Sequence, residues 1–123
     1  MNVICDTNIF IHYFNGDLPT QAEIKKIDLK HVLMPSITKM ELFRGMENKN
    51  KMEWMLSRVK HFHVIHLSEE VSEKATDLIQ QYSLSHGLTI PDALIAAMAI
   101  VYELPLFTYN VKDFRYLPEL NLY

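Results

Sequence analysis

Short apolar runs alternate along the chain with longer stretches in which apolar residues recur at helical spacing. The short runs predict buried strands, because each has the length of a strand and ends at turn or helix-capping residues. Four strands are expected in this way, and a fifth, weaker candidate follows near the end of the chain. They cover residues 3–5, 31–34, 62–67, 106–108 and 120–122.

The stretches between these runs predict helices. Their boundaries are indicated by capping residues such as Ser68, by prolines that suit a first helical turn, and by Gly45 and Gly87 at two ends. The expected helices cover residues 9–14, 19–28, 36–44, 52–59, 69–86 and 93–103. Strands that alternate with helices predict an α/β fold in which helices cover both faces of a mainly parallel sheet.

The length and composition predict a globular protein with one domain over residues 1–123. Hydrophobic residues make up 49% and charged residues 22%, which excludes a disordered or fibrous protein. The longest apolar run, residues 93–102, is about half as long as the roughly 20 residues that a membrane span requires. Cys5 is the single cysteine, and no basic segment typical of a signal peptide precedes the first strand. We therefore expect a cytoplasmic protein with no membrane partner.

The charge argues against nucleic-acid binding through a broad basic surface. The net charge is -3, whereas proteins that bind nucleic acid by bulk charge are basic. Most Lys and Arg residues nevertheless lie within residues 1–65. They are expected either to form one basic side or to lie on solvated helix faces, and the sequence leaves both interpretations open.

Three acidic residues occupy matching positions relative to the predicted strands. Asp6 directly follows the first strand, Glu41 lies about one turn into the helix after the second, and Asp92 opens the helix before the fourth. In an open α/β sheet, ligands bind beyond the carboxyl ends of the strands. We therefore expect all three carboxylates at that edge of the sheet.

Carboxylates gathered in this way are typical of a site for a hard divalent cation such as Mg²⁺ or Mn²⁺. Without a cation they would repel one another and raise one another's pKa. A purely structural role is the alternative, because Asp6 also suits a helix N-cap. Two further pairs match a capping box, Thr38 with Glu41 and Thr89 with Asp92. The spacing alone leaves both interpretations open.

Four segments resemble, in order, the sequence blocks of PIN domains of the VapC toxin type. They are residues 4–11 (ICDTNIFI), 35–45 (PSITKMELFRG), 91–97 (PDALIAA) and 106–114 (LFTYNVKDF), followed by Leu117-Pro118. They run from residue 4 to residue 118 and thus extend over nearly the whole chain. The resemblance implies a three-layer α/β/α fold around a central, mainly parallel sheet of four or five strands.

The resemblance also implies a function. PIN domains of this type are endoribonucleases of toxin–antitoxin systems, so it implies hydrolysis of RNA by a water molecule that Mg²⁺ or Mn²⁺ activates. It further implies a small antitoxin as protein partner and a homodimer. One alternative is a PIN nuclease that acts on other RNA or on single-stranded DNA without an antitoxin. Another is a non-catalytic PIN-like module that binds a metal or a partner.

The resemblance assigns roles to individual residues. Asp6, Glu41 and Asp92 match the three main acids of the family and are the expected metal ligands and catalytic residues. The fourth acidic position of many PIN domains is Asn110 here, and Asp113, one helical turn later, is the candidate for the missing carboxylate. This departure leaves open whether the site binds one metal ion or two. The expected supporting or substrate-binding residues are Thr7, Asn8, Thr108 and Asn110.

Three other features have simpler interpretations. His61, His63 and His66 are poorly spaced for zinc, because a strand places the first two on one face and the third on the other. Cys5 lies in an apolar strand and is expected in the core. The helix over residues 52–59 contains Met and Trp, and it is expected to belong to the core, a dimer face or an antitoxin groove.

Overall fold

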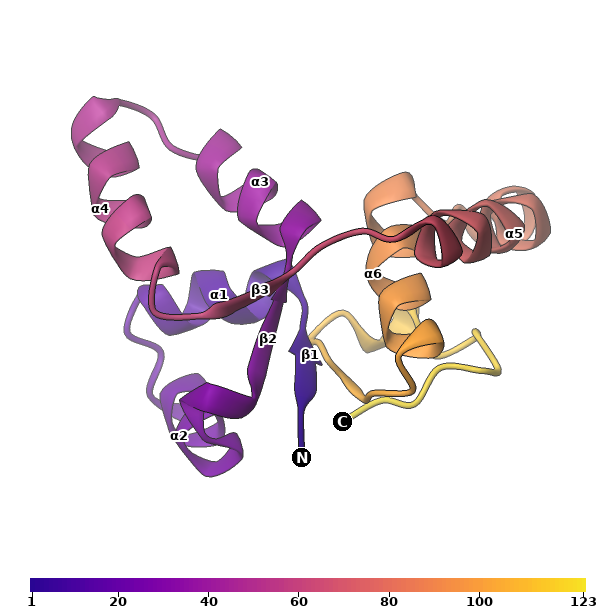
Figure 1. Cartoon of the computed structure of the whole chain (residues 1–123), viewed down its shortest axis with the longest axis horizontal. Coiled ribbons are helices and arrows are strands. Elements are labelled where there is room, and N and C mark those ends of the chain that lie inside the picture. Colours follow the sequence, from indigo (N-terminus) through magenta and orange to yellow (C-terminus); the bar gives the residue numbers. More distant parts are fainter.

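The computed structural model describes residues 1–123 and contains one four-stranded sheet (Figure 1). The strands lie in the order β3-β2-β1-β4, and every neighbouring pair is parallel. Their bounds are Val3–Cys5 for β1, Val32–Pro35 for β2, His63–Ile65 for β3 and Leu106–Phe107 for β4. The predicted parallel sheet is therefore confirmed.

Helices cover both faces of this sheet, as Figure 1 shows. One face carries α1 (Thr7–Phe14), α2 (Leu18–Ile27), α3 (Ser36–Arg44) and α4 (Lys49–Val59). The other carries α5 (Glu69–His86) and α6 (Ile90–Val101). Two 3-10 turns, η1 (Leu29–His31) and η2 (Val111–Asp113), precede β2 and follow β4. None of the helices combines the length and apolar sequence that crossing a membrane would need.

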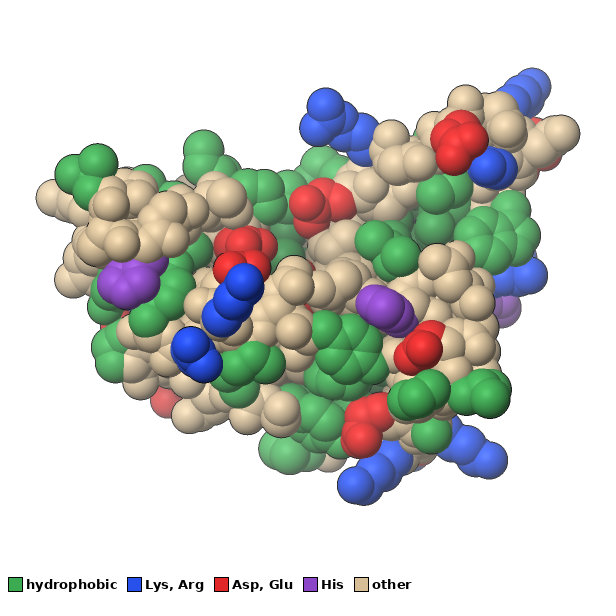
Figure 2. Space-filling view, turned by 180° about the vertical axis from the view of Figure 1, so that it is seen from behind, with side chains coloured by type: hydrophobic (Ala, Val, Ile, Leu, Met, Phe, Trp, Pro, Cys, Tyr) green, Lys and Arg blue, Asp and Glu red, His purple; other side chains and the backbone are tan.

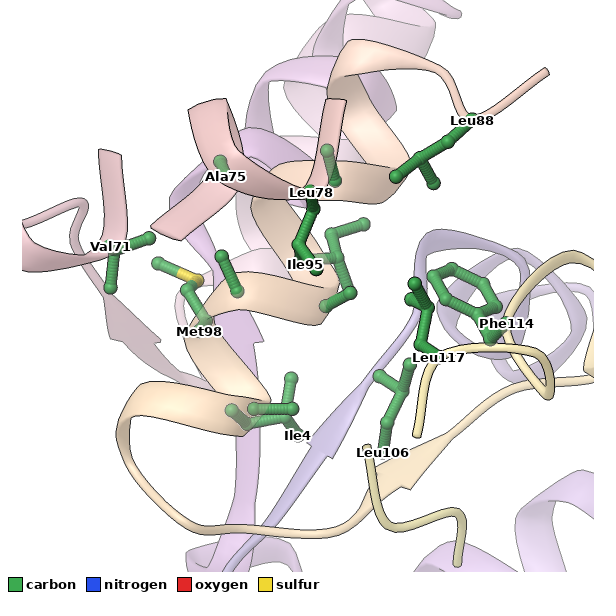
Figure 3. Packing of buried hydrophobic residues seen from close by; sticks show 14 of the residues in the cluster. Ile4, Val71, Ala75, Leu78, Leu88, Ile95, Met98, Leu106, Phe114 and Leu117 are labelled. Carbon is green, nitrogen blue, oxygen red and sulfur yellow. The ribbon is translucent and has the colours of Figure 1, made fainter. Parts of the chain in front are cut away.

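Each face of the sheet has its own hydrophobic core. Side chains alternate along β1, so Val3 and Cys5 pack against the α1–α4 side and Ile4 packs against the α5–α6 side. Figure 3 shows Ile95 and Met98 of α6 between the side chains of α5 and Ile4. The sheet is therefore buried on both faces, as the three-layer prediction requires.

The carboxyl ends of β1 and β4 meet where the chain changes direction across the sheet. The chain moves from β1 to β2 and β3 on one side, and it returns to place β4 on the other side of β1. The backbone N–H of Asp6, just after β1, donates a hydrogen bond to the carbonyl of Phe107 at the end of β4 (2.9 Å). In such sheets, this is the place where ligands bind.

α4 is longer than predicted. It begins at Lys49 rather than Met52, because the side chain of Asn48 accepts a hydrogen bond from the backbone N–H of Lys51 (2.8 Å). This bond satisfies a donor that the first turn of a helix leaves free. The polar residues that suggested a break therefore form the cap and first turn of the helix.

The expected fifth strand is reduced to a single bridge between Leu106 and Leu122. Two backbone hydrogen bonds flank it, from Leu106 N–H to the carbonyl of Asn121 (2.9 Å) and from Tyr123 N–H to the carbonyl of Leu106 (2.8 Å). β4 has only two residues, so it is too short for the last segment of the chain to pair with it as a full strand.

Candidate active site

Asp6 is held at the meeting point of β1 and β4. Its side chain is 4% exposed and caps α1, where Oδ1 accepts a hydrogen bond from the backbone N–H of Thr7 (2.8 Å). Oδ2 accepts a hydrogen bond from the hydroxyl of Thr108, which directly follows β4 (2.8 Å). The cap interpretation of Asp6 is confirmed, but the bond from Thr108 fixes the second oxygen independently of the helix.

Thr7 connects Glu41 to the region around Asp6. The Thr7 hydroxyl donates to Oε1 of Glu41 (2.7 Å) and lies 2.9 Å from the hydroxyl of Thr38. Because a hydroxyl has one proton and Thr7 gives it to Glu41, Thr38 is the donor in the second bond. The first turn of α1 and the middle of α3 are thereby joined by a chain of three side chains.

The capping-box interpretation of Glu41 is wrong. The N-cap of α3 is Pro35, which makes no side-chain capping bond, so Thr38 lies within the helix and not at its start. Thr38 is fully buried and its hydroxyl is directed at Thr7. Sequence reasoning gave Thr38 no role in the site, although its position one turn before Glu41, on the same helix face, is a usable signal.

Asp92 lies in the first turn of α6. The hydroxyl of Thr89, the N-cap, accepts a long hydrogen bond from the backbone N–H of Asp92 (3.4 Å), so half of the predicted capping box is present. Partial burial, and then the negative charges of Asp6 and Asp113, raise the pKa of Asp92 to about 6. The Asp92 side chain is therefore costly to ionise in the absence of a cation.

The charges of the acidic residues act on one another. Burial raises the pKa of Asp6, and the charges of Glu41 and Asp113 raise it further, while the hydrogen bonds from Thr108 and Thr7 act in the opposite direction. None of these carboxylates forms an ion pair: the three salt bridges of the protein join other residues. The negative charges of the site are therefore not neutralised by ion pairs with Lys or Arg.

The structure distinguishes Asn110 from Asp113. The backbone N–H of Asn110 donates to the hydroxyl of Thr108 (3.0 Å), and the side chain of Asn110 is exposed and makes no hydrogen bond. Asp113, in η2, lines a cavity together with Asp92 and raises the pKa of both Asp92 and Asp6. Asp113 therefore contributes the fourth negative charge, whereas the backbone of Asn110 supports Thr108.

These residues offer the hard oxygen donors that Mg²⁺ and Mn²⁺ prefer. No three His, Cys, Asp or Glu side chains converge closely enough to hold one ion among them. The donor set nevertheless fits Mg²⁺, which keeps several water molecules and usually binds one or two carboxylates together with substrate phosphates. Asn8, two residues after Asp6, adds a buried Oδ1 that has no hydrogen-bond partner.

The face of the molecule that is turned away from the viewer in Figure 1 carries charged side chains of both signs. Figure 2 shows acidic and basic side chains interspersed over that face, with no continuous basic area. This agrees with the net charge of -3. A phosphate on that face would therefore contact single basic side chains and not a continuous basic surface.

Comparison with known proteins identifies the family. The PIN domain profile matches residues 3–120. This chain belongs to the PIN domain family. It is 29% identical to Ribonuclease VapC1 of Methanocaldococcus jannaschii, over 98% of this chain and 84% of that protein. It is 30% identical to Ribonuclease VapC of Rickettsia bellii, over 99% of this chain and 95% of that protein.

Solved structures have the same PIN fold. A chain of a toxin-antitoxin complex from Klebsiella pneumoniae superposes with a TM-score of 0.81 at 28% identity, covering 97% of this chain and 95% of the other. A chain of VapBC2 from Rickettsia felis, bound to a DNA fragment of its promoter, gives a TM-score of 0.83 at 24% identity and covers 100% and 98%. The predicted three-layer PIN fold is thus confirmed.

The remaining candidates lie outside the site. His61, His63 and His66 are all exposed along the edge strand β3 and its flanks, and they form no metal cluster. Cys5 is fully buried, as expected, and burial raises the pKa of its thiol well above the usual range. In α4, Met55 belongs to the core, and Met55 and Trp54 both line a mainly apolar cavity of about 230 Å³ beside α1 and α3, which Glu41 also lines.

Proposed function

We propose that this PIN-domain protein is a metal-dependent endoribonuclease and the toxin of a toxin–antitoxin pair. The observation that carries the proposal is the network in which Thr108 and Thr7 direct Asp6 and Glu41 to one edge of the sheet. Asp92 and Asp113 add their charges to the same region. The similarity to proteins named VapC ribonucleases supports RNA as the substrate.

In the proposed reaction, one or two of the carboxylates of Asp6, Glu41 and Asp92 would bind a divalent cation, Mg²⁺ or Mn²⁺, directly, and the others would bind it through water molecules that the ion keeps. When bound, such a cation supplies positive charge to the phosphate oxygens and makes a water molecule more acidic. Thr7 and Thr108 keep the carboxylate oxygens in place by donating hydrogen bonds to them. Glu41, which is half-buried and accepts only the bond from Thr7, has a second oxygen free to accept a proton from the attacking water.

The proposal includes partners and a location. A small antitoxin would neutralise the enzyme, and two copies of the single-domain chain would form a homodimer in the cytoplasm. The toxin-antitoxin complexes among the similar solved structures support an antitoxin partner. A neighbouring gene whose product relieves the growth arrest caused by this protein would separate this proposal from a PIN nuclease that has no antitoxin.

The test compares wild-type protein with Asp6→Asn, in cells and after purification. Asn is similar in size to Asp but is a poorer metal ligand, so we expect Asp6→Asn to lose RNA cleavage and growth inhibition while it remains folded. Asp77→Asn is the matched control, because Asp77 is exposed on α5 and outside the site. Cleavage by wild type that needs Mg²⁺ or Mn²⁺ and stops in EDTA supports the proposal. Full activity of purified Asp6→Asn would defeat it.

A further inference from the structure

A cavity of about 170 Å³ opens beside the carboxylates, between the α5–α6 turn and the segment from η2 to Tyr116. Asp92 and Asp113 line one part of it. His86, Lys112 and Tyr116 also line it, together with residues 87–89, and none of these three side chains belongs to the carboxylate network described above. The cavity therefore continues the candidate active site into a region with different chemistry.

Two aromatic rings that line this cavity are stacked on one another. The rings of His86 and Tyr116 are stacked, with centroids 4.0 Å apart and planes at 12°. Tyr82 packs against both, with centroids 5.8 Å from His86 and 5.4 Å from Tyr116. Tyr116 is half-buried, whereas His86 is exposed at the end of α5. Tyr82 therefore packs against the stacked pair, and His86 is the more exposed member of the pair.

The charges in the cavity divide it into two parts. Asp92 and Asp113 would repel a phosphate beside them, whereas they do not exclude an uncharged group from the part of the cavity that they line. Lys112, the exposed middle residue of η2, forms no ion pair and is available to a phosphate. A nucleotide has both groups, since its base is flat and uncharged and its phosphate is negative.

We propose that this cavity binds one unpaired nucleotide of the RNA, next to the phosphodiester bond that is cleaved. The base stacks on the His86–Tyr116 pair, and Lys112 binds the adjoining phosphate. This inference rests on the proposed ribonuclease function and names a substrate-binding element of the same site.

The test is steady-state cleavage of a single-stranded RNA by the full-length protein and its variants. Loss of base stacking on an aromatic side chain weakens binding by about tenfold, so Tyr116→Leu and His86→Ala should raise KM about that much with little change in kcat. Tyr116→Phe keeps the ring and should match wild type. Tyr102→Leu is the control, because Tyr102 is an exposed tyrosine at the other end of α6. His86→Ala removes an exposed side chain and remains informative if Tyr116→Leu does not fold.

A second measurement tests which base of the RNA stacks on the His86–Tyr116 pair. A fluorescent 2-aminopurine is moved along the RNA around the mapped cleavage position, in a protein that carries Asp6→Asn to prevent cutting. Quenching at one position that disappears when His86→Ala is added supports the proposal. If wild type cleaves RNA but both ring-removing variants keep its KM, the nucleotide site is refuted and the ribonuclease function stands. If wild type cleaves no RNA with any divalent cation, both fail.

Discussion

At the scale of single residues, threonine hydroxyl groups hold the carboxylates of this site in position. Thr7 and Thr108 each donate a hydrogen bond to an acidic oxygen, at 2.7 Å to Glu41 and 2.8 Å to Asp6. Hydrogen bonds to a charged acceptor are stronger than those between neutral groups. The hydroxyls therefore fix where the negative charge lies without adding charge of their own.

Removal of the Thr7 hydroxyl tests this positioning role. Thr7→Val keeps the shape of the side chain but leaves Glu41 without its donor, so the metal concentration needed for half-maximal cleavage should rise by roughly 10-fold or more. Thr7→Ser keeps a hydroxyl and should restore most of the affinity. The measurement is a metal titration of RNA cleavage at fixed substrate. An unchanged metal requirement in Thr7→Val would show that Thr7 does not position Glu41.

Asp113 and Asn110 can be separated in the same titration. Asp113→Ala removes a charge that acts on Asp6 and Asp92, so a higher metal concentration should be needed. Asn110→Ala removes an exposed side chain that makes no hydrogen bond and should leave the requirement near wild type. The opposite ranking of the two variants would assign the fourth position to Asn110.

At the scale of elements, the site collects negative charge from the starts of α1 and α6, the middle of α3, and η2. Asp6 is the N-cap of α1 and Asp92 lies in the first turn of α6, where the helix dipole favours negative charge. Their pKa values are nevertheless raised, so burial and mutual repulsion outweigh the dipole. The cation-free protein therefore keeps these elements together at some cost in free energy.

This cost predicts a pH dependence of stability. Because folding raises the pKa of Asp92 to about 6, ionising Asp92 destabilises the folded protein as the pH rises from about 4 through 6. In EDTA at pH 8, Asp92→Asn should melt a few degrees above wild type, since solvent screening of this partly exposed group limits the effect to roughly 1 kcal/mol. At pH 4 the difference should vanish. Thermal melts at both pH values test this, and an equal difference at both would contradict it.

At the scale of the whole molecule, the sheet brings together acids that are up to 107 positions apart in the chain. Two separate cores hold the helices on either face of the sheet and thereby hold the carboxylates at its edge. A cation that binds only the folded protein must stabilise the whole fold, because the unfolded chain does not bring these residues together.

Thermal melting with added Mg²⁺ or Mn²⁺ therefore reports binding without any substrate. Saturation to 100 times the dissociation constant should stabilise wild type by about 2.7 kcal/mol, which is several degrees in Tm. Asp6→Asn should lose most of this gain, and Asp77→Asn should keep it. If both variants respond to the cation like wild type, the cation binds somewhere other than the proposed site.

Local signals were sufficient to predict most of the elements and the placement of Asp6, Glu41 and Asp92 relative to the strands. Asp6 ends a short apolar run and starts a helix, and both features depend only on neighbouring residues. The start of α4 and the absence of a fifth strand were not predicted, because the first depends on one capping bond and the second on the length of β4.

The sequence by itself determined the order of strands and helices and which acids follow which strands, since hydrophobic periodicity and capping act over a few residues. Only the tertiary structure decided which hydroxyl group donates a hydrogen bond to which carboxylate. It also decided that the hydroxyl of Thr38 forms a hydrogen bond with that of Thr7, 31 positions away in the chain. It also decided that His86 stacks on Tyr116. The physical reason is that a hydrogen bond or a stacked pair needs atoms within a few ångströms, and packing of the two cores against the sheet sets those distances.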